Sequence, residues 1–192
     1  MSSSMNVSPQ TRIVMDELDR LRTRDDAWQI PRPEAEALYD LVLRHQYKLG
    51  VEIGTSYGYS GLHFAAALSH TGGKLHTIDI SQKKFDASRQ TFARAGLSNL
   101  IVSHLGDALI LLPTIPGDFD FAFLDATKDE TRAYFDLVWP RIRPGGVVLT
   151  DNITTHPELK PYVQYLRGLP DATSHTLEVG NGVEVTQKKK AT

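Results

Sequence analysis

The chain has 192 residues, of which 41% are hydrophobic and 23% charged, and these proportions are ordinary for a folded, soluble domain. It holds no cysteine, which excludes disulfides, thiolate zinc sites and a cysteine nucleophile. The formal net charge of −2 argues against a large basic surface for nucleic acid. No apolar run reaches the roughly 18 residues of a membrane-spanning helix, and no secretory signal pattern is present. We therefore expect a cytoplasmic protein that binds neither nucleic acid nor membrane.

Two helices are predicted ahead of the first strand. Ser8 and Pro9 form a typical helix start, and apolar residues follow them at helical spacing. A break is predicted at residues 24–26 and again at residues 31–33, and a second helix is predicted over residues 34–45. We expect residues 1–7 to be loosely ordered, and residues 1–30 to form a helical extension of a single domain covering residues 1–192.

From residue 51 onwards, short apolar runs alternate with helical patterns. The predicted strands are 51–53, 75–80, 100–105, 119–124 and 147–150, and the predicted helices are 61–68, 81–95, 130–142 and 158–167. Two further strands, 174–179 and 183–187, flank a glycine-rich turn. This order predicts an α/β, Rossmann-like fold, with a seven-stranded, mostly parallel sheet, helices on both faces and a C-terminal antiparallel hairpin.

Acidic residues lie within or just after the end of each of the five predicted parallel strands. They are Glu52, Asp79, Asp107, Asp125 and Asp151. In an open parallel sheet, ligands bind outside the carboxyl ends of the strands. A single acid in this place is often only a helix cap, but five at the same edge indicate a binding site.

The loop after the first strand has the composition of a nucleotide-binding turn. Gly54 and Gly58 allow the backbone to turn tightly and approach a ligand, and Ser60 stands at the head of the next helix. The dinucleotide fingerprint Gly-x-Gly-x-x-Gly is absent, which disfavours a nicotinamide or flavin enzyme. Because Asp79 is placed like an acid that binds ribose hydroxyls, the pattern favours another adenosine ligand, with a plain glycine-rich turn as the alternative.

A second group of polar residues follows two strands that we expect to be neighbours. Asp125, Asp151 and Asn152 offer two carboxylates and one amide oxygen, which suit a hard cation, magnesium first, with calcium or manganese as alternatives. The competing interpretation is that Asp151 and Asn152 only form the turn after a strand. Lys128 lies in the same loop as Asp125, and a divalent cation nearby would favour its neutral form, which can accept a proton.

The motifs together resemble those of the metal-dependent class I O-methyltransferases, the family that includes catechol and caffeoyl-CoA O-methyltransferases. The resemblance extends over about residues 30–187. Its motifs are Val-Glu-Ile-Gly-Thr-Ser-Tyr-Gly-Tyr-Ser at 51–60, Thr-Ile-Asp at 77–79, Gly-Asp-Ala at 106–108, Phe-Leu-Asp-Ala-Thr-Lys at 123–128, Arg-Pro-Gly-Gly at 143–146 and Thr-Asp-Asn at 150–152.

The resemblance implies S-adenosylmethionine as the cofactor and a small-molecule acceptor. By matching positions, Glu52, Gly54, Thr55 and Ser60 would surround the methionine part of the cofactor, with Gly58 in the same turn. Asp79 would bind the ribose, and Asp107 and Ala108 would lie by the adenine. The magnesium ligands would be Asp125, Asp151 and Asn152, and the catalytic residues would be Lys128, as the base, and Asp125.

The expected function is therefore a magnesium-dependent O-methyltransferase acting on a small vicinal diol of the catechol type. The segment after Asn152 is shorter than the insertion of the plant acyl-CoA enzymes, which disfavours a coenzyme A ester as acceptor. Two alternatives stay open: a metal-independent methyltransferase of the same fold, and a non-catalytic S-adenosylmethionine-binding module. The resemblance also suggests a homodimer and leaves the oligomeric state open.

Overall fold

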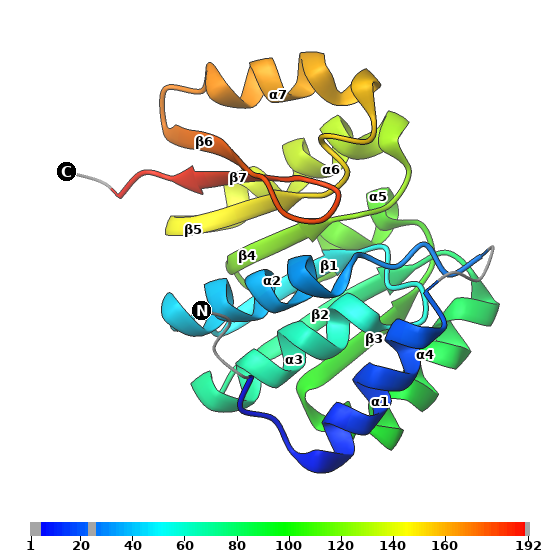
Figure 1. Cartoon of the computed structure of the whole chain (residues 1–192). Coiled ribbons are helices and arrows are strands. Elements are labelled where there is room, and N and C mark those ends of the chain that lie inside the picture. The colour runs from blue at the N-terminus through cyan, green and yellow to red at the C-terminus, as the bar shows by residue number, and fades with distance from the viewer. Residues whose placement is uncertain (1–4, 23–25, 191–192) are drawn as a thin grey trace.

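The computed structural model describes residues 5–22 and 26–190 and has a central sheet with helices on both sides (Figure 1). The strands are β1 (Leu49–Ile53), β2 (Lys74–Asp79), β3 (Ile101–Leu105), β4 (Phe119–Leu124), β5 (Ile142–Thr150), β6 (Ala172–Leu177) and β7 (Val183–Lys188). The helices are α1 (Pro9–Arg20), α2 (Arg32–Arg44), α3 (Tyr59–Thr71), α4 (Gln82–Arg94), α5 (Ala108–Leu111), α6 (Thr131–Val138) and α7 (Lys160–Arg167). Short 3-10 turns, such as Lys128–Glu130, complete the pattern.

The seven strands form one sheet in the order β3-β2-β1-β4-β5-β7-β6. The first five strands pair in parallel, whereas β7 pairs antiparallel with both β5 and β6. The hairpin thus inserts β7 between β5 and the edge strand β6. The predicted fold class is confirmed, including the antiparallel hairpin at the C-terminus.

Each face of the sheet is covered by its own set of helices (Figure 1). Strand alternation divides the core, because successive side chains of a strand point to opposite faces. Phe121 and Phe123 pack in the cluster that includes residues of α1 to α4, whereas Ala122 and Leu124 pack with residues of α5 to α7. Burial on both faces explains why β4 is a continuous apolar run in the sequence.

The connection from β4 to β5 differs from the prediction. The helix expected at 130–142 ends at Val138, and β5 begins at Ile142 rather than at residue 147. The Pro-Gly-Gly segment at 144–146 lies inside β5, at a point where the register against β4 shifts. A Cβ on Gly146 would come within 2.5 Å of the Asp120 carbonyl oxygen, so the glycine permits an irregular strand in place of the predicted turn.

The first helix begins as predicted. The Ser8 side chain caps α1 by accepting a hydrogen bond from the Thr11 N–H at 3.1 Å. The expectation of a loose segment through residue 7 is wrong for Met5, which is 8% exposed and packs in the core. Residues 1–4 and most of the predicted break at residues 24–26 lie outside the described residues. Within the described part of the chain, no helix is both long and apolar enough to cross a membrane.

Candidate active site

The ends of β1, β4 and β5 bring the loop after β1 and two of the predicted acids together at one edge of the sheet. Hydrogen bonds of the sheet continue past the strand ends. The Asp125 N–H donates to the Ile53 carbonyl at 2.9 Å, and the Asp151 N–H donates to the Leu124 carbonyl at 3.1 Å. Asp125 therefore lies between the loop that follows β1 and Asp151, which follows β5.

Two glycines make this arrangement possible. Gly54 has φ +100°, and a Cβ there would lie 2.1 Å from the carbonyl oxygen of Asp125. Gly58 has φ +89° and caps α3, and a Cβ there would lie 2.6 Å from the Phe92 ring. The first glycine sets how closely the loop approaches β4, and the second sets how α3 packs on α4.

Glu52 is completely buried beneath the loop. Its two carboxylate oxygens accept hydrogen bonds from the hydroxyls of Ser60 at 2.6 Å and Thr77 at 2.5 Å, and Thr77 also lies 2.5 Å from the Thr55 hydroxyl. Burial raises the pKa of Glu52 to about 7. The structure thus joins the predicted residues Glu52, Thr55 and Ser60 in one network that supports the loop from below.

Asp79 fixes the outer side of the same loop. Its carboxylate accepts hydrogen bonds from the backbone N–H groups of Ser56 and Ser81, both at 2.8 Å. The Ser56 hydroxyl in turn donates to the Ala27 carbonyl at 2.5 Å. Asp79 therefore stands at the end of β2 as predicted, and the segment after α1 lies against the loop that it orders.

Asp107 acts as a helix cap. Its side chain accepts a hydrogen bond from the Leu109 N–H at 2.8 Å at the start of α5, a short helix that the sequence did not predict. Ala108, the first residue of α5, is 7% exposed. The cap uses only one of the two carboxylate oxygens of Asp107, so this role is compatible with a position beside an adenine.

Asp125 and Lys128 form a short ion pair at the end of β4. Lys128 Nζ lies 3.0 Å from Asp125 Oδ1, and both side chains are largely buried, with exposures of 16% and 14%. The loop places Lys128 at the start of a 3-10 turn, three residues after Asp125. Burial first, and then the nearby charge of Asp151, raise the pKa of Asp125.

Asp151 carries an oxygen that has no partner. The residue is 1% exposed, its Oδ1 accepts a hydrogen bond from the Asn152 N–H at 2.5 Å, and its Oδ2 has no hydrogen-bond donor. Asn152 has φ +68°, a left-handed conformation that asparagine tolerates, and its carbonyl accepts from the Thr155 N–H at 3.2 Å, so the turn after β5 is at residues 153–155. Burial, followed by the neighbouring charge of Glu34, raises the pKa of Asp151.

Glu34 is a buried acid at this site that the sequence analysis did not identify. It lies in the first turn of α2 and is completely buried, and its Oε2 accepts a hydrogen bond from the Asn181 N–H at 2.8 Å. The carboxyl groups of Glu34 and Asp151 interact directly, and Oε1 of Glu34 has no donor. An acid at a helix start is ordinarily explained by the helix dipole, so the sequence held no signal for its place here.

The residues at the ends of β4 and β5 fit a divalent cation. Within residues 5–22 and 26–190, no three His, Cys, Asp or Glu side chains are arranged to hold a metal ion together. A cation beside Asp125 and Asp151 would therefore need Asn152 as its third protein ligand, and such an oxygen set suits magnesium. The unpartnered Oδ2 of Asp151 supports this fit, because a buried carboxylate oxygen without a donor is costly unless a cation or proton satisfies it.

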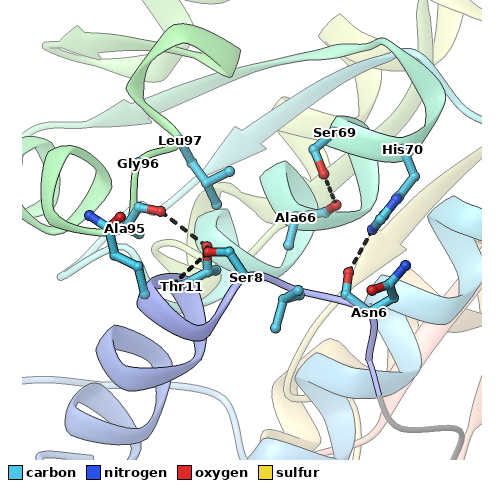
Figure 2. A pocket seen from close by; sticks show the side chains of 11 residues that line it. Asn6, Ser8, Thr11, Ala66, Ser69, His70, Ala95, Gly96 and Leu97 are labelled. Carbon is cyan, nitrogen blue, oxygen red and sulfur yellow. Dashed lines mark hydrogen bonds between the residues drawn. The ribbon is translucent and has the colours of Figure 1, made fainter.

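One cavity lies beside Lys128, and another lies away from it. A cavity of about 350 Å³ borders Lys128 and extends between α6 and the start of α7. Another, of about 370 Å³, lies between the start of α1 and the last turns of α3, where His70 contacts the Asn6 carbonyl (Figure 2). Because α3 begins at the loop after β1 and runs away from it, only the first of these two cavities adjoins the Asp125–Lys128 pair, through Lys128.

Comparison with known proteins gives the family. Residues 51–153 match a family model described as a methyltransferase domain. The caffeoyl-CoA O-methyltransferase of Zinnia elegans is 30% identical over 199 residues, which cover 95% of this chain and 80% of that protein. This chain belongs to the class I O-methyltransferase family. The resemblance inferred from the motifs is thereby confirmed.

Other members of the O-methyltransferase family agree in sequence and fold. The catechol O-methyltransferase of Niastella koreensis is 33% identical over 112 residues, which cover 56% of this chain and 50% of that protein. The chain thus spans about half the length of several curated relatives that it matches. The structure of the O-methyltransferase TomG from Streptomyces achromogenes, in complex with SAM, superposes with a TM-score of 0.83 at 27% identity, covering 98% of this chain and 93% of TomG.

Proposed function

We propose that this chain is an S-adenosylmethionine-dependent O-methyltransferase that requires a divalent cation and methylates one hydroxyl of a small vicinal diol of the catechol type. One observation carries the proposal. The Asp125–Lys128 ion pair lies next to the buried Asp151, directly beside the loop that follows β1. A base, cation ligands and a cofactor loop at one sheet edge together suit cation-assisted methyl transfer to a hydroxyl.

The cofactor assignment rests on the loop and on the relatives. The loop after β1 is held from below by Glu52 and from outside by Asp79, and α3 begins at its end. Among solved relatives, TomG carries SAM. We assign the cofactor to Glu52, Gly54, Thr55, Gly58, Ser60, Asp79, Asp107 and Ala108, as the motifs predict.

The cation assignment rests on the donor set of Asp125, Asp151 and Asn152. Magnesium held there, or calcium or manganese, would stabilise the deprotonated form of an acceptor hydroxyl. A vicinal diol suits this chemistry because its two oxygens can approach one cation together. The oxygen of Asp151 that has no donor is the natural ligand on the β5 side.

Lys128 and Asp125 perform the proton transfer in this proposal. In its neutral form, the Lys128 amine accepts the proton of the acceptor hydroxyl. Asp125 keeps Nζ of Lys128 in place at the end of β4. The loop after β1 approaches the end of β4 closely at Gly54, and this would bring a cofactor bound at the loop close to an acceptor bound at Lys128. Positioning of this kind supplies much of the rate of a two-substrate reaction.

The acceptor is proposed to be small because of the cavity beside Lys128. Its volume of about 350 Å³ suits a single aromatic ring with substituents better than a coenzyme A ester. Its lining mixes charged, apolar and aromatic side chains: Lys128, Asp129, Thr131, Arg132, Glu158, Leu159, Pro161 and Tyr162.

The experiment measures methyl transfer from S-adenosylmethionine to catechol and, as a control, to resorcinol, whose hydroxyls are not adjacent. We expect product from catechol with magnesium, and a loss of at least about 100-fold after chelation, because the charge stabilisation is removed. Turnover that survives chelation would show a metal-independent methyltransferase of the same fold. Cofactor binding by calorimetry without product from any acceptor would show a non-catalytic binding module.

A further inference from the structure

Glu34 joins three parts of the molecule that are distant in the sequence. It comes from the first turn of α2, its Oε2 is anchored by the Asn181 N–H in the turn between β6 and β7, and its carboxyl group contacts that of Asp151 after β5. The family match at residues 51–153 includes Asp151 but neither Glu34 nor Asn181. Glu34 therefore links the hairpin and α2 to the end of β5 from outside that region.

The contact between Glu34 and Asp151 is not explained by internal packing. Both residues are at most 1% exposed, yet Oε1 of Glu34 and Oδ2 of Asp151 have no hydrogen-bond donor. Two carboxylate oxygens repel each other in a buried place unless a proton or a cation intervenes. Among the described residues, Glu34, Asp125 and Asp151 do not form a three-ligand metal cage, so we do not count Glu34 as a metal ligand.

We propose that Glu34 is a positioning residue for the cation site: anchored by the Asn181 N–H, it holds the Asp151 carboxyl group in the orientation that binds a divalent cation together with Asp125. This inference rests on the proposed function, because it assumes that a cation binds at Asp151. Residues that orient metal ligands from behind typically change metal affinity when they are replaced. Glu34 would be such a residue, supplied by the N-terminal helices.

Two substitutions separate positioning from simple space filling. Glu34→Gln keeps both contacts, because the amide oxygen can accept from the Asn181 N–H while the amide nitrogen donates to Asp151. Glu34→Ala removes both contacts. Asp40→Asn, on the same helix α2, is the matched control for loss of a carboxylate away from the site.

A third variant disturbs Glu34 without changing it. Gly180 is exposed in the β6–β7 turn, and a Cβ there would lie 2.2 Å from Oε2 of Glu34. Gly180→Ala must therefore displace the Glu34 carboxyl group, and it tests the proposal even if Glu34→Ala fails to fold. Gly96→Ala is its control, because Gly96 also has positive φ but its Cβ would meet nothing closer than 3.8 Å.

The measurement is Mn²⁺ binding, followed by electron paramagnetic resonance of the free aqueous ion, to protein saturated with S-adenosylhomocysteine. We expect Glu34→Ala and Gly180→Ala to weaken Mn²⁺ binding by roughly 10- to 100-fold. Glu34→Gln and both controls should bind Mn²⁺ like the original protein. Calorimetric affinity for S-adenosylhomocysteine should stay constant throughout, which checks that each variant is folded.

The outcomes distinguish this inference from the function on which it rests. Unchanged Mn²⁺ affinity in Glu34→Ala and Gly180→Ala would overturn the positioning role, even if both variants lose thermal stability. Equal losses in Glu34→Gln and Glu34→Ala would also overturn it, because the glutamine retains both contacts. If the unaltered protein binds no Mn²⁺ and methylates in the presence of chelator, the cation requirement itself fails, and that result needs no variant.

Discussion

Replacement of Glu52 by glutamine should change how the stability of the ligand-free protein depends on pH. Glu52 is fully buried, and burial raises its pKa to about 7 from an ordinary value of 4.5. A carboxyl group whose pKa is raised by folding stabilises the folded state fully below pH 4.5, and this contribution is lost as pH rises through about 7. The difference between the two pKa values corresponds to about 3 kcal/mol as an upper limit. Between pH 5 and 8 the original protein should therefore lose up to that amount more than the Glu52→Gln variant, which keeps only the titration of the other buried acids.

The assay is denaturant unfolding of both proteins at several pH values, with the free energy of unfolding of one subtracted from that of the other. The other buried acids are present in both proteins, so their titration largely cancels in the difference. The exposed Glu178, replaced by glutamine, is the control for the loss of a surface carboxylate. A constant offset between the original protein and Glu52→Gln from pH 5 to pH 8 would refute the reasoning, because it would show that burial does not hold a proton on Glu52.

Two further substitutions test the base and the loop. Lys128→Met should lower turnover of catechol by about 10²- to 10⁴-fold while calorimetry shows unchanged cofactor affinity; normal turnover would contradict the role of Lys128 as the base. Gly54→Ala should lower the free energy of unfolding by about 3 kcal/mol or more, because its Cβ meets the Asp125 carbonyl oxygen at 2.1 Å. Gly72→Ala, with φ +72° and no atom within 4 Å of its Cβ, should cost only about 1 kcal/mol. Equal losses of stability in these two alanine variants would show that the close approach at Gly54 is not needed.

The sheet edge was predictable because its residues follow directly from strand order. Asp125 and Asp151 come immediately after two apolar runs, and parallel strands end at the same edge, so their proximity needs only the strand assignment. Lys128 is three residues from Asp125 and reaches it within one loop. The sequence indicates that Gly54 allows a tight turn, but the backbone that requires a glycine there, at Asp125, is seen only in the structure.

The parts that were missed depend on contacts between distant segments. Glu34 reaches Asp151 only because α2 packs beside the β6–β7 turn, which no local pattern of residues encodes. The Pro-Gly-Gly segment at 144–146 has the local chemistry of a turn, yet it lies within β5, because Ile142 before it and Val147 after it both pair with β4. The sequence places Asp107 among the acids expected to bind a ligand, with helix capping as the alternative for each single acid. In the structure Asp107 does cap a helix, through its hydrogen bond from the Leu109 N–H.

The clustering of acids would favour the cationic ligands that we propose. Burial raises the pKa of four acids: Glu34, Glu52, Asp125 and Asp151. Their ionisation therefore lowers the free energy of unfolding progressively as pH rises toward neutrality. Lys128 pairs with Asp125. A divalent cation and a sulfonium cofactor both bring positive charge, and a ligand that binds only the folded state stabilises it according to its concentration and affinity. The buried carboxylates that destabilise the ligand-free protein would therefore attract the two cationic ligands that we propose and so contribute to their affinity.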